Sequence, residues 1–295
     1  MVDCSRELEK YWDEKVKLPQ DKYNELMKKR DLQIDKLKSN LKSDNFPLPI
    51  EFINQGSYAM KTLVQQNEEY DLDIGVVFNK EDLENKNKSQ PSSIKNYIGQ
   101  KLKDERFAKS SSVLKNCVRV NYKENYHIDM PVFRKNANTL ELATSTGWES
   151  SNPQNINRWF QHEKSNKPHL KKIVQLLKKW SKSRSEFKNI MPSGLILSIL
   201  ASECYIDDDR LDISFYKTLD KMNIRLKKCR IVFVPNTSVD ITVEAKHREK
   251  VKKLSEKLSG YFNGMFKENN FRDKDRALKV WKMFFADRYF EGFIR

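Results

Sequence analysis

The chain has 295 residues, of which 38% are hydrophobic, 33% charged and 11% aromatic, and its net charge is +15. This composition argues against disorder and supplies enough apolar material for one large or two medium domains. The basic balance is typical of a surface that attracts nucleic acid, nucleotides or acidic membrane, but the charge is spread through the chain, so an ordinary solvated surface is an equal alternative.

The cysteines and the N-terminal stretch bear on the compartment. The four cysteines are far apart and form no CxxC pair, which argues against zinc and favours buried free thiols. No apolar stretch reaches the ~20 residues of a membrane-spanning helix, and the N-terminus has no leader-like apolar region. We therefore expect a soluble cytoplasmic protein that does not bind membranes.

The first elements in chain order are helical. Residues 5–43 are predicted to be helix with an interruption near Pro19, and apolar side chains recur at three- and four-residue steps in 20–43. The segment 46–50, FPLPI, ends this helix. Strands are predicted at 70–78, 112–122 and 126–134, with a polar loop at 79–92 and a helix at 92–105.

The remainder of the chain changes to a helical pattern. Helices are predicted at 167–183, 193–205, 247–265 and 274–290, with a strand-like interruption at 229–236. The aromatic residues near the C-terminus are typical of a terminal helix that docks into a core; they are Trp281, Phe284, Phe285 and Phe290. We place the domain boundary between 1–147 and 148–295.

Two aspartates interrupt the apolar strand YDLDIGVVF at 70–78. Because side chains alternate along a strand, Asp71 and Asp73 share one face and Leu72 and Ile74 the other. Two adjacent carboxylates repel, and a divalent cation such as Mg²⁺ would neutralise them. A solvent-facing acidic edge is the less favoured alternative.

A third aspartate interrupts a second strand in the same manner. Asp129 lies within YHIDMPVF at 126–133, so two core strands together offer three carboxylates. His127 shares the face of Asp129, where packing at a strand end is favoured over support of a ligand. Gly56 and Ser57 precede the first pair of aspartates, and glycine permits close backbone approach while serine offers a hydroxyl to a phosphate.

These segments resemble the polymerase-β-like nucleotidyltransferases, whose pattern is Gly-Ser, then Asp/Glu-x-Asp, then a distal Asp. Within that superfamily the chain is most similar to the bacterial cGAS/DncV-like nucleotidyltransferases, which make cyclic oligonucleotide signals in anti-phage (CBASS) defence. The segments QGSYAMKT at 55–62 and ALKVWKMFFADRYF at 277–290 also resemble that group. The resemblance implies an α+β fold, in which a nucleotidyltransferase core with a mixed sheet is joined to a C-terminal helical domain and the helix at 20–43 bridges both.

The resemblance also implies nucleotide-binding residues outside the acidic strands. In the family a helix lysine and the residue that opens the next helix hold the triphosphate, which here are Lys178 in LLKKW and Ser193 in MPSGLILSIL. The competing lysines are Lys171, Lys172 and Lys179. Asp240 falls where family members place a residue near the base, and Gln55 and Tyr58 flank the Gly-Ser pair, although loop packing explains Tyr58 equally well.

The implied reaction joins NTPs into a cyclic di- or trinucleotide with release of pyrophosphate. Asp71, Asp73 and Asp129 would hold two Mg²⁺ ions, for which Mn²⁺ can substitute. The substrates would be ATP or GTP, with pyrimidine NTPs also open, and a downstream effector would respond to the product rather than to contact with a protein we expect to be a monomer.

Two other functions stay open. The first is linear oligonucleotide synthesis or nucleotidyl transfer to RNA or protein. The second is a binding protein that senses double-stranded RNA or DNA, whose affinity would fall steeply with salt. A nucleic-acid activator is not favoured, because the chain lacks a zinc-ribbon insertion of the kind found in the animal DNA sensor.

Overall fold

The computed structural model describes residues 1–65, 70–103, 108–122 and 126–294. The chain forms two compact units, which we call the sheet unit (Pro19–Lys61 and Asn67–Arg158) and the helical unit (Met1–Leu18, Thr62–Gln66 and Trp159–Arg295). The expected α+β fold, with a mixed sheet and a helical C-terminal region, is confirmed. The boundary expected at residue 147 stays a prediction.

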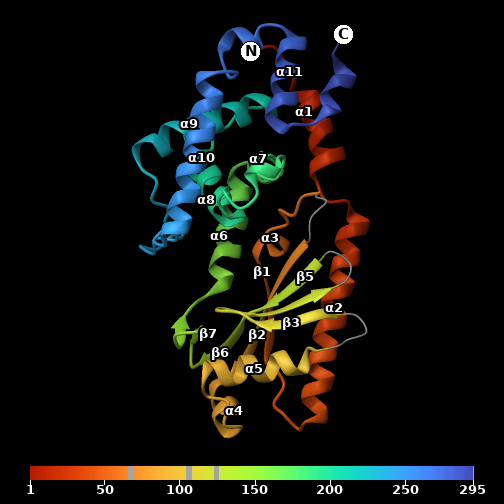
Figure 1. The fold of residues 1–295 in the computed structure, drawn as a ribbon, viewed down its shortest axis with the longest axis vertical. Coiled ribbons are helices and arrows are strands. Elements are labelled where there is room, and N and C mark those ends of the chain that lie inside the picture. The colour runs from red at the N-terminus through yellow and green to blue at the C-terminus, as the bar shows by residue number, and fades with distance from the viewer. Residues whose placement is uncertain (66–69, 104–107, 123–125, 295) are drawn as a thin grey trace. The chain divides into compact units, whose positions relative to one another are not determined.

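The described strands of the sheet unit form one eight-stranded mixed sheet (Figure 1). Their order is β3-β4-β5-β2-β6-β7-β8, and β1 pairs with β2 outside this path. The strands are β1 Glu51–Gln55, β2 Tyr70–Asn79, β3 Ala108–Val113, β4 Val118–Tyr122, β5 Tyr126–Met130, β6 Val132–Asn136, β7 Thr139–Ala143 and β8 Trp148–Ser150.

Strand β2 is the centre of this sheet. It runs parallel to β5 and β6 and antiparallel to β1. The segment expected as one strand at 126–134 follows β2 throughout, but Pro131 separates β5 from β6 because it has no N–H to donate. The Pro131 carbonyl still accepts from Val76 N at 2.9 Å. The single strand expected at 112–122 is wrong: the chain reverses after β3, where Leu114 N donates to Cys117 O at 2.8 Å.

Helices α2 (Gln20–Ser43) and α5 (Pro91–Lys101) pack in the sheet unit and contact each other (Figure 1). Helix α5 contacts β3, β4 and β7, and Ile94 and Ile98 are fully buried there. Leu37 and Leu41 of α2 are also fully buried. Two short helices complete the unit, α3 Gly56–Ala59 and α4 Lys80–Asn85, the second in a segment expected to be a loop.

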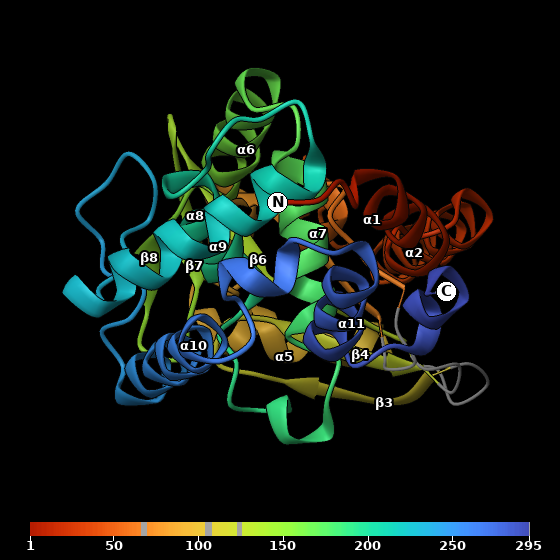
Figure 2. The same cartoon turned by 90° about the horizontal axis from the view of Figure 1, so that it is seen from above.

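The helical unit contains most of the remaining described helices. They are α1 Ser5–Tyr11, a π-helical turn Trp12–Val16, α7 Leu170–Trp180, α8 Gly194–Glu203, α9 Leu211–Lys228, α10 Ala245–Asn263 and α11 Lys274–Phe285. Helix α6, Pro153–Asn166, contributes its residues from Trp159 onward. Helix α9 was not expected from the sequence; it lies between α8 and α10 and contacts both (Figure 2). The strand expected at 229–236 is wrong, since only the bridge Phe233–Asp240 forms there.

Aromatic side chains form the core of the helical unit. Trp180 of α7 stacks on Phe284 of α11 with ring centroids 5.2 Å apart, and Phe284 lies edge-on to Phe285. Trp281 and Phe290 are fully buried in the same cluster. The docking role expected for the terminal helix is therefore confirmed.

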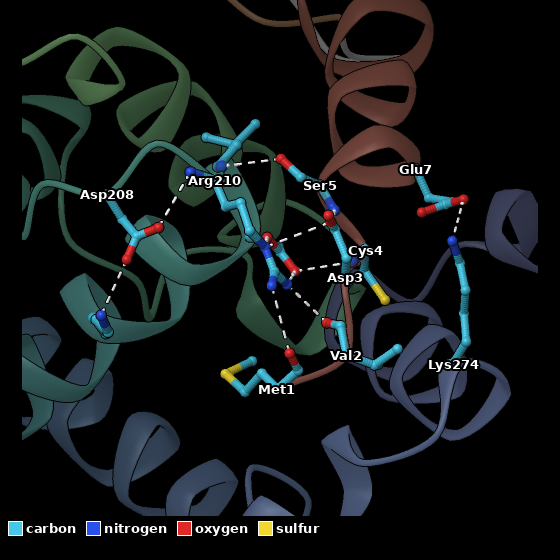
Figure 3. Close-up of polar contacts among 12 residues, drawn as sticks. Met1, Val2, Asp3, Cys4, Ser5, Glu7, Asp208, Arg210 and Lys274 are labelled. Carbon is cyan, nitrogen blue, oxygen red and sulfur yellow. Dashed lines mark hydrogen bonds and ion pairs between the residues drawn. The ribbon is translucent and has the colours of Figure 1, made fainter.

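The first residues of the chain are bound to α9 and α11 by polar contacts (Figure 3). Cys4 N donates to the buried carboxylate of Asp212 at 3.0 Å, and Leu211 N donates to Ser5 Oγ at 3.1 Å. Arg210 Nη2 donates to the Val2 carbonyl at 2.8 Å. These contacts bind α1 to the start of α9.

The cysteines and the lengths of the helices were the subject of two further expectations. All four cysteines are free; Cys4 and Cys204 are buried as expected, whereas Cys229 is exposed. Within the described ranges, every helix is too short or too polar to cross a membrane.

Candidate active site

The two aspartates of β2 lie on one face of the sheet, as strand alternation predicts. The Asp71 side chain is 58% exposed and Asp73 is partly buried, whereas Leu72 and Ile74 are fully buried on the other face. The apolar side chains thus anchor β2 in the core while both carboxylates project from the same surface.

Asp73 is part of a polar row that crosses four strands. Its register partners are Gln55 on β1 and Asp129 on β5, and the partner of Asp129 on β4 is Arg119. Neighbouring strands lie only ~4.8 Å apart, so these side chains are close neighbours. The structure therefore brings Asp129 next to Asp73. We call Asp71, Asp73 and Asp129 the acidic cluster.

Two basic side chains of adjacent strands contact this cluster. Arg119 donates from Nε to Asp129 Oδ1 and from Nη2 to Asp129 Oδ2, both at 2.7 Å, which is the bidentate geometry favoured by arginine and carboxylate. His127 is 7% exposed, and its Nε2 lies 2.9 Å from Asp71 Oδ1. His127 thus packs in the sheet, as expected, and also contacts a member of the cluster.

Arg119 was not predicted from the sequence, although a signal was present. It lies between Val118 and Val120, which are fully buried, so it interrupts an apolar strand in the same way as the aspartates do. The alternation marks the face on which Arg119 projects. Its pairing with Asp129 depends on strand register, which the sequence pattern does not reveal.

The electrostatics of the cluster centre on Asp73. Burial, followed by repulsion from Asp129 and Asp71, raises the pKa of Asp73 to about 6. The hydrogen bond to Asp71 raises the pKa of His127, and the hydrogen bonds to Asp129 raise the pKa of Arg119. Asp73 is therefore the carboxylate whose negative charge the surroundings destabilise.

The donor chemistry of the cluster fits a divalent cation. Three carboxylates on one sheet face are the hard oxygen ligands that Mg²⁺ prefers, and a cation beside Asp73 would offset the penalty on its charge. As they lie, no three His, Cys, Asp or Glu side chains of the described residues are arranged to hold an ion. Asp129 is turned toward Arg119, and Asp71 toward His127.

Gly56 is required at the edge of this cluster for two reasons. Its φ of +62° is one that other residues adopt only with strain, and a Cβ at this position would lie 2.2 Å from Asp73 Oδ2. The Asp73 carboxylate thus occupies the space that any other residue would fill. Ser57 follows in the first turn of α3 and is partly exposed.

Gln55 and Tyr58, on either side of the Gly-Ser pair, are placed differently. The Gln55 amide lies over Gly75, where a Cβ would be 2.5 Å from Gln55 Nε2. Tyr58 is 3% exposed and stacks on Tyr23 with centroids 5.0 Å apart, so its ring is engaged in packing. The nucleotide-binding roles of both residues stay predictions.

The Lys178 side chain lies against Gly194, the residue after Ser193, at the start of α8 in the helical unit. Lys178 is 7% exposed and donates from Nζ to Thr62 Oγ1 at 2.6 Å. A Cβ on Gly194, the residue after Ser193, would lie 2.9 Å from Lys178 Cε. Burial lowers the pKa of Lys178 to about 7. Ser193 is exposed and caps α8 by accepting from Ile196 N at 3.4 Å.

Asp240 lies in the turn between α9 and α10. It accepts hydrogen bonds from the backbone N–H and the hydroxyl of Thr242, which lower its pKa. Arg248 Nη2 is 3.9 Å away. These contacts organise the turn, and the expected proximity of Asp240 to a base stays a prediction.

Comparisons with known proteins show what the segment that contains this site is similar to. Residues 50–133 match the family described as cyclic GMP-AMP synthase DncV-like, nucleotidyltransferase domain. This range contains the acidic cluster, Gly56 and Ser57. A cyclic GMP-AMP synthase of Escherichia albertii is 27% identical over 221 residues, which are 71% of this chain and 49% of that protein. The chain thus spans about half the length of this curated relative.

Solved structures share the fold. The cyclic AMP-GMP synthase DncV of Vibrio cholerae matches with a TM-score of 0.68 and 16% identity over 92% of each chain. CdnC of E. coli MS115-1, solved with ATP, matches with a TM-score of 0.72 and 13% identity over 98% of this chain and 99% of CdnC. The predicted resemblance is therefore confirmed: residues 50–133 match a DncV-like nucleotidyltransferase domain, and the chain shares the fold of DncV and CdnC.

Proposed function

We propose that this protein joins nucleoside triphosphates into a cyclic di- or trinucleotide that acts as a second messenger in anti-phage defence. The observation that carries the proposal is the register of β2 and β5, which sets Asp73 beside Asp129 within the matched domain. The relatives support the same class of product, since two of them are described as cyclic dinucleotide synthases.

The acidic cluster would hold two Mg²⁺ ions. When bound, such ions stabilise the attacking and leaving oxygens of an in-line displacement at the α-phosphate. Asp71 and Asp73 would contribute one carboxylate each, and Asp129 a third. Asp129 would also accept the proton of the attacking ribose hydroxyl, because its carboxylate lies beside Asp73 at the end of the cluster.

The remaining site residues would position the nucleotide. Ser57, which follows a glycine that leaves room for the carboxylate, would offer its hydroxyl to a phosphate. Lys178 and Ser193 would contact the triphosphate, and Gln55, Tyr58 and Asp240 complete the proposed nucleotide-binding set. Such contacts accelerate the reaction by orientation rather than by covalent chemistry.

The test is to incubate the pure protein with each labelled NTP and Mg²⁺ or Mn²⁺, and to identify the product by mass. We expect a cyclic product that resists phosphatase, and none from the Asp71→Asn/Asp73→Asn protein. A phosphatase-sensitive chain with a 5′-triphosphate would instead identify linear synthesis. Activity only after double-stranded RNA or DNA is added would identify a gated enzyme, and no incorporation under any of these conditions would refute the proposal.

A further inference from the structure

Arg119 occupies both oxygens of one proposed metal ligand. Its two 2.7 Å hydrogen bonds take Oδ1 and Oδ2 of Asp129 together. The Asp129 side chain is 14% exposed and that of Arg119 33%, so water screens the pair only in part. The Cys117 thiol also lies against Asp129. The guanidinium is thus the positive charge that Asp129 contacts directly.

This position places a fixed positive charge where a cation would have to approach. Asp129 is the register partner of Asp73 on one side and of Arg119 on the other. An ion shared by Asp73 and Asp129 must therefore draw at least one Asp129 oxygen away from the two hydrogen bonds of Arg119, which we call the fork. Otherwise the ion must bind within a few ångströms of a guanidinium that cannot lose its charge. Either event opposes binding of the ion.

We propose that Arg119 is a built-in counter-ion of the acidic cluster that positions Asp129 and competes with divalent cations for it. The inference rests on the proposed function, because the competing ion is the one assigned to this cluster. In this arrangement Arg119 stabilises three crowded carboxylates when no ion is bound, and it sets the concentration of cation that the site requires.

A second arginine of the same sheet provides a matched control. Arg134 on β6 and Glu141 on β7 are also register partners on antiparallel strands, as Arg119 and Asp129 are. Arg134 Nε donates to Glu141 Oε2 at 2.6 Å, and their side chains are 14% and 22% exposed. This pair contains no residue of the acidic cluster, so its loss should affect stability without affecting cation binding.

The experiment measures Mn²⁺ binding to the full chain without nucleotide, by electron paramagnetic resonance of free Mn²⁺. Arg119→Met should bind Mn²⁺ about tenfold more tightly than the wild type, a conservative figure for one unit charge a few ångströms away at an effective dielectric constant near 20. Arg119→Lys, which keeps the charge but loses the fork, should differ from the wild type by less than about threefold, because the opposing charge remains. Arg134→Met should bind like the wild type.

Thermal unfolding provides a second readout. In EDTA both Met variants should have a lower Tm than the wild type, because each leaves a carboxylate without its partner. Saturating Mn²⁺ should restore the Tm of Arg119→Met and leave the deficit of Arg134→Met unchanged. If Arg119→Met does not fold, Arg119→Gln carries the same expectations, since it is neutral and retains hydrogen-bond donors.

The outcomes separate this inference from the proposed function. If Mn²⁺ binds the wild type and Asp73→Asn abolishes binding, but the Arg119 variants bind equally or more weakly, the counter-ion role is refuted and the metal site stands. If the wild type does not bind Mn²⁺ with or without ATP, both are refuted.

Discussion

Replacement of Lys178 by Met should stabilise the protein while it weakens nucleotide binding. Lys178 is buried, and its pKa falls from an ordinary value of 10.5 to about 7 because burial disfavours the ammonium form. A difference of about 3.5 pKa units between the unfolded and folded protein corresponds to a ceiling of about 5 kcal/mol. Near pH 7 the buried lysine lowers the free energy of unfolding by about 4 kcal/mol, which is close to that ceiling.

Met removes this penalty but leaves the buried Thr62 hydroxyl without the Nζ donor, a loss of about 1–3 kcal/mol. The net gain near pH 7 is therefore about 1–3 kcal/mol, or roughly 2–5 °C in Tm. Between pH 7 and 10.5 the unfolded lysine binds more protons than the folded one, so wild-type stability rises with pH across this window. The advantage of Lys178→Met should accordingly be largest below pH 7 and shrink toward pH 10.

The assay is thermal unfolding of both proteins from pH 6 to 10 without nucleotide, followed by ATP and GTP binding at pH 7. Lys178→Met should bind the triphosphate on the order of tenfold to hundredfold more weakly, since a charge-assisted phosphate contact contributes about 1.5–3 kcal/mol. Lys179→Met is the control: Lys179 is only partly buried, so both effects should be smaller. A Tm difference that does not vary with pH would refute the reasoning, as would a variant that is less stable at pH 6.

Three further changes test the site. In EDTA, Asp73→Asn should raise the free energy of unfolding above pH 6 by up to about 3 kcal/mol, because the raised pKa of Asp73 reflects a penalty on its charged form. This gain should vanish as the pH falls from 6 to 4. A thermal scan at each pH measures the gain, and a loss of stability at pH 8 would contradict the prediction. Gly56→Ala should lower both Tm and turnover, the turnover by more than tenfold, because the new Cβ collides with Asp73. Gly260→Ala on α10 is the control: its Cβ meets no atom within 4 Å, so this variant should be neutral or stabilising. Equal turnover of the two variants would count against the close approach of Gly56 and Asp73. Ser193→Ala should lower the free energy of unfolding by about 1 kcal/mol through loss of the α8 cap, as measured by denaturant titration. Ser193→Asn can still cap the helix and should keep most of the wild-type stability. If the Asn variant is as unstable as the Ala variant, the loss has a cause other than capping.

The parts of the fold that could be predicted are those with long, regular patterns. Helix α2 has the predicted bounds of 20–43, and β2 extends one residue beyond the predicted 70–78. By contrast, β1, β7 and β8 are three to five residues long and only partly buried, so they lack the apolar runs by which the longer strands were predicted. Helix α6 was missed for a similar reason, since Phe160 is its one fully buried residue.

Helix α9 is a different case, because its sequence does carry the helical period. Leu211, Phe215, Leu219, Met222 and Leu226 recur at three- and four-residue steps and are all fully buried. This period marks a helix between the acidic run at 207–209 and the apolar stretch at 229–236. The reversal within 112–122 is hard to predict from the pattern, because this segment contains no glycine or proline to mark a turn.

The site shows the same division between local and non-local information. The alternation of side chains along a single strand is enough to place Asp71, Asp73 and Asp129 on the polar faces of their strands, without knowledge of the strand register. The fork of Arg119 on Asp129 and the contact of His127 with Asp71 follow from how β4, β5 and β2 align, which is set by turns and packing elsewhere. The position of Gly56 against Asp73 likewise arises only when β1 lies beside β2.

The central place of β2 has a consequence for hydrogen exchange. From Asp73 to Val77 the strand is flanked by β1 on one side and by the β5–Pro131–β6 run on the other, so its amide hydrogens are protected until the sheet itself opens. The three-residue strand β8, at the end of the strand order, can open alone and should exchange with deuterium much earlier. Moderate heating that opens β8 at the edge of the sheet should therefore leave the spacing of Asp73 and Asp129 unchanged. That spacing should be lost only when the slowest-exchanging amides of β2 exchange.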